Sequence, residues 1–237
     1  MLIRLLVPCL IVLFAALPAT AQFDQALERL GLGKAAEPGE SKISSGLKEA
    51  LKIGTENAVH LTGKTNGYFA NEAIKILMPE KLQVMEQGLR AVGYGPKIDE
   101  FVLSMNRAAE GAAPHAKQIF WDALGQMTFQ DARKILAGGN TSATEYFRGK
   151  TSEKLTAAFT PVVKKTMDQV GVVRKYEGLL GHVQSIPFLK SETFDVNHYV
   201  VTKALDGLFT VLGEEEKKIR TNPVARTTDL LKEVFGK

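Results

Sequence analysis

The stretch VNHYVVTKALDGLFTVL, residues 196–212, predicts a helix with a single apolar face. Its apolar side chains recur three and four residues apart, which is the period of one face of an α-helix. These side chains are Val196, Tyr199, Val200, Leu205, Leu208, Phe209 and Leu212. Gly207 breaks the pattern at a cost of about 1 kcal/mol relative to alanine. We interpret this glycine as a point of close helix packing.

The same helical period recurs along most of the chain. It occurs in residues 43–61, 82–89, 98–105, 119–127, 155–170 and 176–186. Asn222-Pro223 opens a last helix with a side-chain cap and a proline at the first helical position. Helices usually contain about 11 to 12 residues, so the sequence predicts an all-α, single-domain bundle of roughly eight to ten helices.

Several short motifs predict where these helices begin and end. Residues 128–131 and 142–145 have capping-box spacing, in which a hydroxyl and a carboxylate bond the first backbone amides of a helix. Between them, Gly138-Gly139 is expected to provide a left-handed helix stop. Pro161 lies within a long apolar stripe, so we expect the helix to kink or restart there.

Residues 73–79, AIKILMP, alternate between apolar and other side chains and form the exception to the helical period. Alternation of this kind is typical of a β-strand. A single strand would have no partner elsewhere in this chain, so we expect buried extended coil and at most a minor extended segment.

The N-terminus has the pattern of an export signal. Arg4 precedes an apolar run, residues 5–17, and the small-residue sequence Ala19-Thr20-Ala21 follows it. The run is shorter than the roughly 20 residues that span a bilayer. We therefore expect cleavage after Ala21, no transmembrane anchor afterwards, and a periplasmic location.

Three segments follow from this pattern: the signal peptide at residues 1–21, a short amphipathic helix and flexible linker at 22–45, and a helical domain at 46–237. The helix covers residues 23–30, and the linker from Gly31 to Ser45 is rich in Gly, Pro, Ser and charge. Ser44 or Ser45 is expected to cap the first helix of the domain.

Composition excludes several kinds of function. The only cysteine, Cys9, lies inside the signal, so the mature chain has neither a disulfide nor a thiolate nucleophile. The net charge is only +4, which does not indicate a nucleic-acid target. The sequence contains no nucleotide-binding glycine loop, and its four histidines have no metal-ligand spacing. We expect no cofactor and no metal.

Three polar clusters remain as candidate binding residues. They lie at residues 106–110, at 146–151 and at 214–220 with Arg226 beyond, and the candidates are Asn106, Arg107, Glu110, Tyr146, Arg148, Arg220 and Arg226. The functional interpretation makes the first two clusters a polar pocket for an anionic or amide-bearing ligand, since arginine offers paired donors to such groups. The alternative is ion pairs between helices. For 214–220 we expect a solvated helix face with Glu214–Lys218 and Glu216–Arg220 pairs.

Several of these motifs together resemble the bacterial family known as domain of unknown function 4197. They are GLKEAL at 46–51, MNRAAE at 105–110, MTFQDA at 127–132, YFR at 146–148, ALDGLF at 204–209 and IRTNPVARTTDLLKEVF at 219–235. The resemblance covers nearly the whole mature chain. It implies an exported, mostly helical, single-domain envelope protein, and it implies no activity.

The leading hypothesis is a non-catalytic binding or scaffolding module in the cell envelope. Its partner would be an apolar or anionic small ligand, or an envelope protein that docks on the Met- and Phe-bearing helix faces. One alternative is a hydrolase of an envelope polymer that uses Glu110 and Asp122 as its carboxylate pair. Another is a structural homo-oligomer in which the helix at residues 23–30 docks on a neighbouring subunit.

Overall fold

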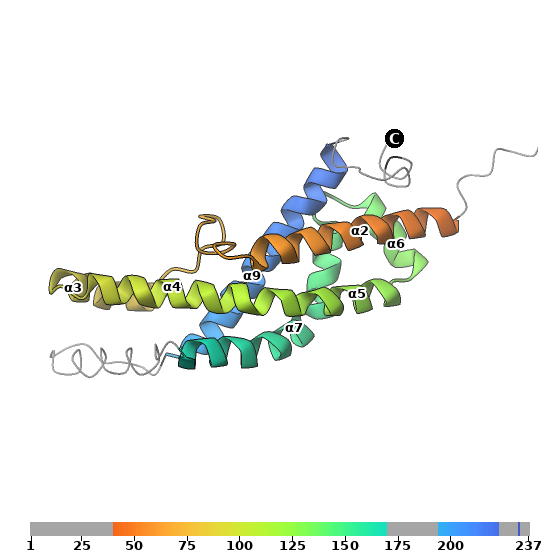
Figure 1. Ribbon diagram of the computed structural model, residues 1–237. Coiled ribbons are helices and arrows are strands. Elements are labelled where there is room, and N and C mark those ends of the chain that lie inside the picture. The colour runs from red at the N-terminus through yellow and green to blue at the C-terminus, as the bar shows by residue number, and fades with distance from the viewer. Residues whose placement is uncertain (1–39, 170–193, 223–231, 233–237) are drawn as a thin grey trace, which may run out of the picture. The chain divides into compact units, whose positions relative to one another are not determined.

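The computed structural model describes residues 40–169, 194–222 and 232 of the chain (Figure 1). The chain divides into two units, residues 1–39 and Glu40–Lys237, and the description below concerns the second. The expected signal peptide, the helices at 23–30 and 176–186, the helix after Asn222 and the candidate Arg226 all lie outside the described residues.

The described elements are helical, and no strand occurs among these residues. The α-helices are α2 (Glu40–Gly63), α3 (Gln83–Ala91), α4 (Gly95–Ala112), α5 (Ala116–Gln126), α6 (Phe129–Ala137), α7 (Ser142–Gln169) and α9 (Val196–Thr221). Two 3₁₀ turns, Glu80–Leu82 and Ala113–His115, precede α3 and α5. The all-α class is confirmed.

The described part of the chain contains fewer helices than the expected eight to ten, partly because α7 runs through Pro161 without a restart. The start of α2 also differs from the expectation. The helix already begins at Glu40, so the prediction that Ser44 or Ser45 caps it is wrong. In the sequence, Pro38-Gly39 stands directly before Glu40.

The boundaries of α6 show one prediction confirmed and one wrong. Thr128 and Asp131 form the expected capping box, with Asp131 N–H donating to Thr128 Oγ1 over 3.1 Å. At the other end Gly138 is extended, with φ −86°, so the expected left-handed stop is wrong. A Cβ at Gly138 would lie 2.1 Å from Ser142 Oγ. Close approach, not backbone handedness, therefore requires this glycine.

The core lies where α9 packs against α7 and α2, and where α4 packs against α7. Three fully buried rings from α5, α7 and α9 meet in it: Phe120 contacts Phe147 edge to face at 5.2 Å between centroids, and Phe209 at 6.1 Å. Such geometry adds about 0.5–1.5 kcal/mol per pair to the burial itself. Phe159 of α7 is fully buried in the same core.

Residues 64–79 connect α2 to α3 without helix and lie against α9. A Cβ placed on Gly207 would lie 2.5 Å from Cε1 of Tyr68 and 3.1 Å from Cβ of Ile74. Both neighbours are buried, so neither can move aside. Gly207 therefore does permit close packing, but its neighbour is this connection and not another helix.

We expect Gly207→Ala to lower the free energy of unfolding by about 1 to 3 kcal/mol, the usual cost of overpacking a filled core. The gain in helix propensity, about 1 kcal/mol, should offset only part of this. Urea denaturation measures the change. Gly125→Ala is the matched control, because a Cβ at that helical glycine would meet nothing within 4 Å; equal stability of the two variants would contradict the assigned contact.

Candidate functional site

The amide of Asn106 holds the coil at residues 75–79 against α4. Its Oδ1 accepts the N–H of Ile76 over 2.9 Å, and its Nδ2 donates to the C=O of the same residue over 2.8 Å. Asn106 is fully buried. Ile74, Ile76 and Met78 are buried while Leu77 is 57% exposed. The expected coil is confirmed for residues 75–79, whereas Ala73 and Ile74 belong to a turn in which the N–H of Ile74 donates to the C=O of Asn71 over 3.0 Å. The side-chain amide of Asn106 thus bonds the backbone N–H and C=O of Ile76, as a neighbouring strand would in a β-sheet.

One turn further along α4, the carboxylate of Glu110 holds the start of the same connection. Its Oε1 accepts the backbone N–H groups of Tyr68 and Phe69, each over 3.1 Å, and its Oε2 accepts from Arg107. Arg107 also donates to Oδ1 of Asn66 over 2.7 Å, and Asn66 has a left-handed φ of 65°. Asn106, Arg107 and Glu110 therefore act together on residues 66–76.

Two tyrosine hydroxyls, one on the connection and one on α9, join the connection to α9. Tyr68 donates from its hydroxyl to the C=O of Ala204 over 2.6 Å, and Tyr199 donates to the C=O of Leu77 over 3.0 Å. Burial, reinforced by the nearby charge of Glu110, raises the pKa of the Tyr68 hydroxyl far above its usual value of 10.0. Tyr68 therefore stays protonated in the folded state.

This pKa shift predicts loss of stability in alkali. Because the folded pKa exceeds the unfolded one, the contribution of Tyr68 is complete below about pH 10 and declines above it. We expect the free energy of unfolding to fall by up to about 1.4 kcal/mol per pH unit there from this group alone. Denaturation at several pH values for wild type and Tyr68→Phe measures the effect; parallel curves would contradict it.

Arg148 and Tyr146 on α7 lie apart from the Glu110 group. Arg148 pairs with Asp206 over 3.2 Å, and both side chains are about half exposed, at 49% and 51%. Its guanidinium also lies 4.5 Å from the centroid of the Phe209 ring. Tyr146 is partly buried and donates to the C=O of Ala123 over 3.4 Å. Arg148 thus joins α7 to α9 through Asp206.

We expect truncation of the two arginines to have unequal effects. Arg148→Ala should cost less than about 1 kcal/mol, as for other exposed ion pairs. Arg107→Ala removes a charge-assisted bond from a carboxylate that is only 5% exposed, and should cost about 1.5 to 3 kcal/mol. Chemical denaturation of both variants decides this, and a larger loss for Arg148→Ala would contradict the assignment.

The acidic run 214–216 is not the solvated face that we expected. Glu215 and Glu216 are buried. Glu216 accepts the N–H groups of Ala143 and Thr144, each over 2.9 Å, at the start of α7. The expected cap by Ser142 is therefore wrong, since a carboxylate from α9 takes that role. The Glu216–Arg220 pair is confirmed at 2.9 Å, whereas Lys218 pairs with Glu215, not with Glu214.

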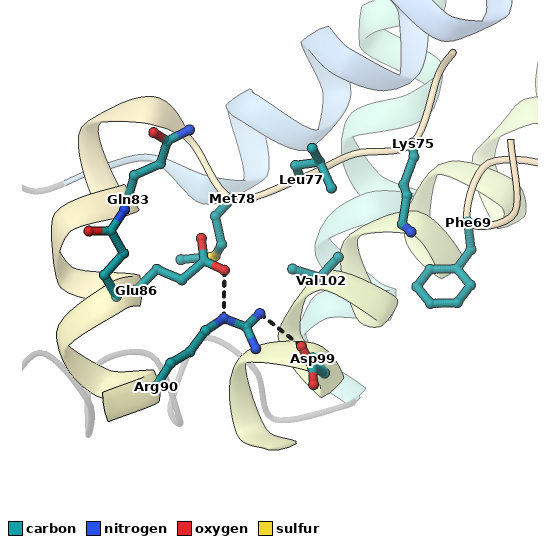
Figure 2. Close-up of a pocket in the computed structure, with 10 residues that line it drawn as sticks. Phe69, Lys75, Leu77, Met78, Gln83, Glu86, Arg90, Asp99 and Val102 are labelled. Atoms are coloured by element: carbon teal, nitrogen blue, oxygen red, sulfur yellow. Dashed lines mark hydrogen bonds and ion pairs between the residues drawn. The ribbon is translucent and has the colours of Figure 1, made fainter. Parts of the chain in front are cut away.

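Two hollows in the described surface border the extended residues 73–79. The first, which we call the α3-side pocket, has a volume of about 440 Å³. Figure 2 shows its apolar floor of Leu77, Met78 and Val102, with Lys75 and Phe69 at one end and Arg90 at the other. Arg90 donates to Glu86 over 2.9 Å and to Asp99 over 2.8 Å, which fixes α3 against α4.

The second hollow, the α9-side groove, has a volume of about 590 Å³. One wall is formed by residues 73–81, and the other by residues of α9 and by Phe194 just before it. The α9 residues are Tyr199, Lys203, Asp206, Gly207 and Thr210. Both volumes fall within the roughly 300–1,000 Å³ typical of ligand sites.

The candidate residues that the structure describes do not line either hollow. Asn106, Arg107 and Glu110 form one group, Tyr146 and Arg148 lie on α7, and Arg220 caps the C=O of Ile135 over 2.7 Å. Sequence reasoning missed the lining residues Lys75, Leu77, Arg90, Tyr199 and Lys203. The alternation in residues 73–79 was the available signal, because an extended segment among helices leaves hollows along its edges.

The proposed carboxylate pair does not share a pocket. Both oxygens of Glu110 are occupied by Tyr68, Phe69 and Arg107, whereas Asp122 is exposed on α5 and accepts from Gln118 over 2.8 Å. In the described part of the chain no three His, Cys, Asp or Glu side chains cluster as metal ligands. None of the described helices is long and apolar enough to cross a membrane.

Fold and site together define an all-α module in which polar side chains of α4 and α9 hold one extended segment between two hollows. The sequence model of one family, described as Protein of unknown function (DUF4197), matches residues 37–236. The chain belongs to this family. No curated protein and no solved structure is significantly similar to it.

Proposed function

We propose that the protein is a non-catalytic binding module and that its binding site is the surface around residues 73–79. The observation that carries the proposal is the pair of hollows along one extended segment, with Leu77 exposed between buried neighbours. The segment is anchored from α4 and α9, so its shape exists before a partner arrives. A preformed site loses less conformational entropy on binding.

The alternative of a carboxylate-dependent hydrolase has less support. Such an enzyme needs an acid and a second carboxylate that face one substrate. Glu110 is closed off by its own hydrogen bonds, and Asp122 lines neither hollow. The homo-oligomer hypothesis rests on residues 23–30, outside the described residues. Light scattering with and without residues 22–41 tests it.

We further propose that the protein is exported and acts in the periplasm after cleavage behind Ala21. The support is the sequence pattern of Arg4, the apolar run and the small residues at 19–21. Intact-mass measurement on protein recovered from its own cell envelope tests this. A mass that starts at Gln22 is expected, and a mass that retains residues 1–21 would contradict it.

Native mass spectrometry of the same envelope preparation tests the binding function. Leu77→Glu places a charge in both hollows and should abolish any bound mass. Val84→Glu is the matched control, because Val84 is exposed to 71% on α3 and lines neither hollow. A wild-type monomer without any bound mass, or equal loss from both variants, would contradict the proposed site.

A further inference from the structure

We propose that the α9-side groove binds an extended, acidic peptide segment of a partner protein, which pairs with residues 75–77 as an added strand. This inference rests on the proposed function, because it names the partner of the same site. The evidence is the direction of three consecutive peptide groups, the shape of the groove and its charge.

The first step concerns the backbone of Ile76. Its N–H and C=O both bond Asn106 on α4. The flanking peptide bonds are trans, so in each the C=O and the N–H point in opposite directions. The C=O of Lys75 and the N–H of Leu77 therefore point away from α4, towards the side where Tyr199 reaches the C=O of Leu77.

These two groups form an open edge. Within the described residues no hydrogen bond engages the C=O of Lys75 or the N–H of Leu77. An unpaired strand edge is a template for another chain. One guest residue that donates to Lys75 and accepts from Leu77 would complete the pattern of a parallel strand pair. Strand addition of this kind gives affinity through main-chain bonds and specificity through side-chain pockets.

The groove beside this edge fits such a guest in size and charge. Its volume of about 590 Å³ suits a few extended residues. The rings of Phe194 and Tyr199, which both line it, lie 5.6 Å apart between centroids and are tilted by 59°. Lys75, Lys81 and Lys203 line the groove, as do the carboxylates Glu80 and Asp206. Asp206 is already paired with Arg148, and Lys75 with Glu72 over 3.3 Å. Besides these pairs, the lining has two lysines, Lys81 and Lys203, and one carboxylate, Glu80. Charge complementarity therefore favours acidic side chains on the guest.

The test uses a pool of end-blocked hexapeptides in which Glu alternates with Val, Ile or Thr. Binding to the mature chain is followed by fluorescence anisotropy and by the amide resonance of Leu77, which should shift on titration. Leu77→Pro removes the N–H that the guest needs, and among the described residues this N–H makes no hydrogen bond. It should weaken binding at least about tenfold, the worth of roughly one strong hydrogen bond.

Two further variants separate the loss of the Leu77 N–H from the loss of its side chain and from the effect of charge. Leu77→Ala keeps the N–H and should weaken binding by less than about threefold, and Lys203→Gln should reduce both the affinity and its salt dependence. Fully N-methylated peptides test the guest's donors on wild-type protein, so the result does not depend on how Leu77→Pro folds. They should not bind.

The outcomes distinguish this inference from the proposed function. Binding that survives Leu77→Pro or N-methylation, or no binding of the pool, overturns strand pairing. If the bound mass in the native spectra still depends on Leu77 in that case, the binding site stands and its ligand is not a peptide strand. If neither peptide binding nor bound mass depends on Leu77, both proposals fail.

Discussion

Replacing Glu110 by alanine should lower the free energy of unfolding by about 3 to 5 kcal/mol, the usual cost of removing one partner from a buried ion pair. Glu110 is 4% exposed. Its loss leaves the N–H groups of Tyr68 and Phe69 and part of Arg107 without their acceptor. Because native domains are stable by only about 5 to 15 kcal/mol, this change should be close to the largest that one substitution can cause.

Urea denaturation of Glu110→Ala and Asp122→Ala measures this effect against a matched control. Asp122 is an exposed carboxylate on α5 whose one described bond is to Gln118, so its removal should cost less than about 1 kcal/mol. Amide exchange should also rise at Tyr68 and Phe69 in the Glu110 variant, because these N–H groups lose their acceptor. Equal stability of the two variants would show that Glu110 does not anchor the connection.

Glu216→Ala should cause a comparable loss, again about 3 to 5 kcal/mol. This carboxylate accepts two backbone N–H groups and the hydroxyl of Thr144 at the start of α7, and it pairs with Arg220. The first N–H groups of a helix have no partner inside the helix. Without Glu216 the amides of Ala143 and Thr144 would be buried with no acceptor, and the contact between α7 and α9 would weaken.

Glu214→Ala is the control for this prediction, since Glu214 is exposed two residues earlier on the same helix. Its removal should change stability by less than about 0.5 kcal/mol. Thermal denaturation of both variants, with far-UV circular dichroism as the signal, compares them directly. If the Glu216 variant had the same melting temperature as the Glu214 variant, α7 would not depend on this cap.

These anchors bear on function because they shape the surface around residues 73–79. The motif MNRAAE contributes Asn106, Arg107 and Glu110. The described hydrogen bonds of these three side chains are all made with other residues of the same chain. In the motif ALDGLF, the C=O of Ala204 accepts from Tyr68, and Asp206 pairs with Arg148. Gly207 leaves room for the connection to pack against α9. Both stretches thus contact the connection between α2 and α3.

Local sequence was sufficient for much of this architecture. Apolar side chains three and four residues apart predict the helices, since that spacing decides which face can be buried. The capping box of Thr128 and Asp131 could also be predicted, because both partners lie within one helical turn. The alternation at 73–79 likewise predicts an extended segment, since its buried positions are two residues apart.

Tertiary structure alone decided the polar contacts that define the site. Ile76 meets Asn106 thirty residues away, Tyr68 meets Ala204, and Glu216 meets the start of α7. No local period encodes such pairs. A buried N–H or C=O needs a partner wherever packing places it, and that place depends on how α4, α7 and α9 cross. The sequence therefore determined the helices, whereas helix packing determined which polar residues face each other across them.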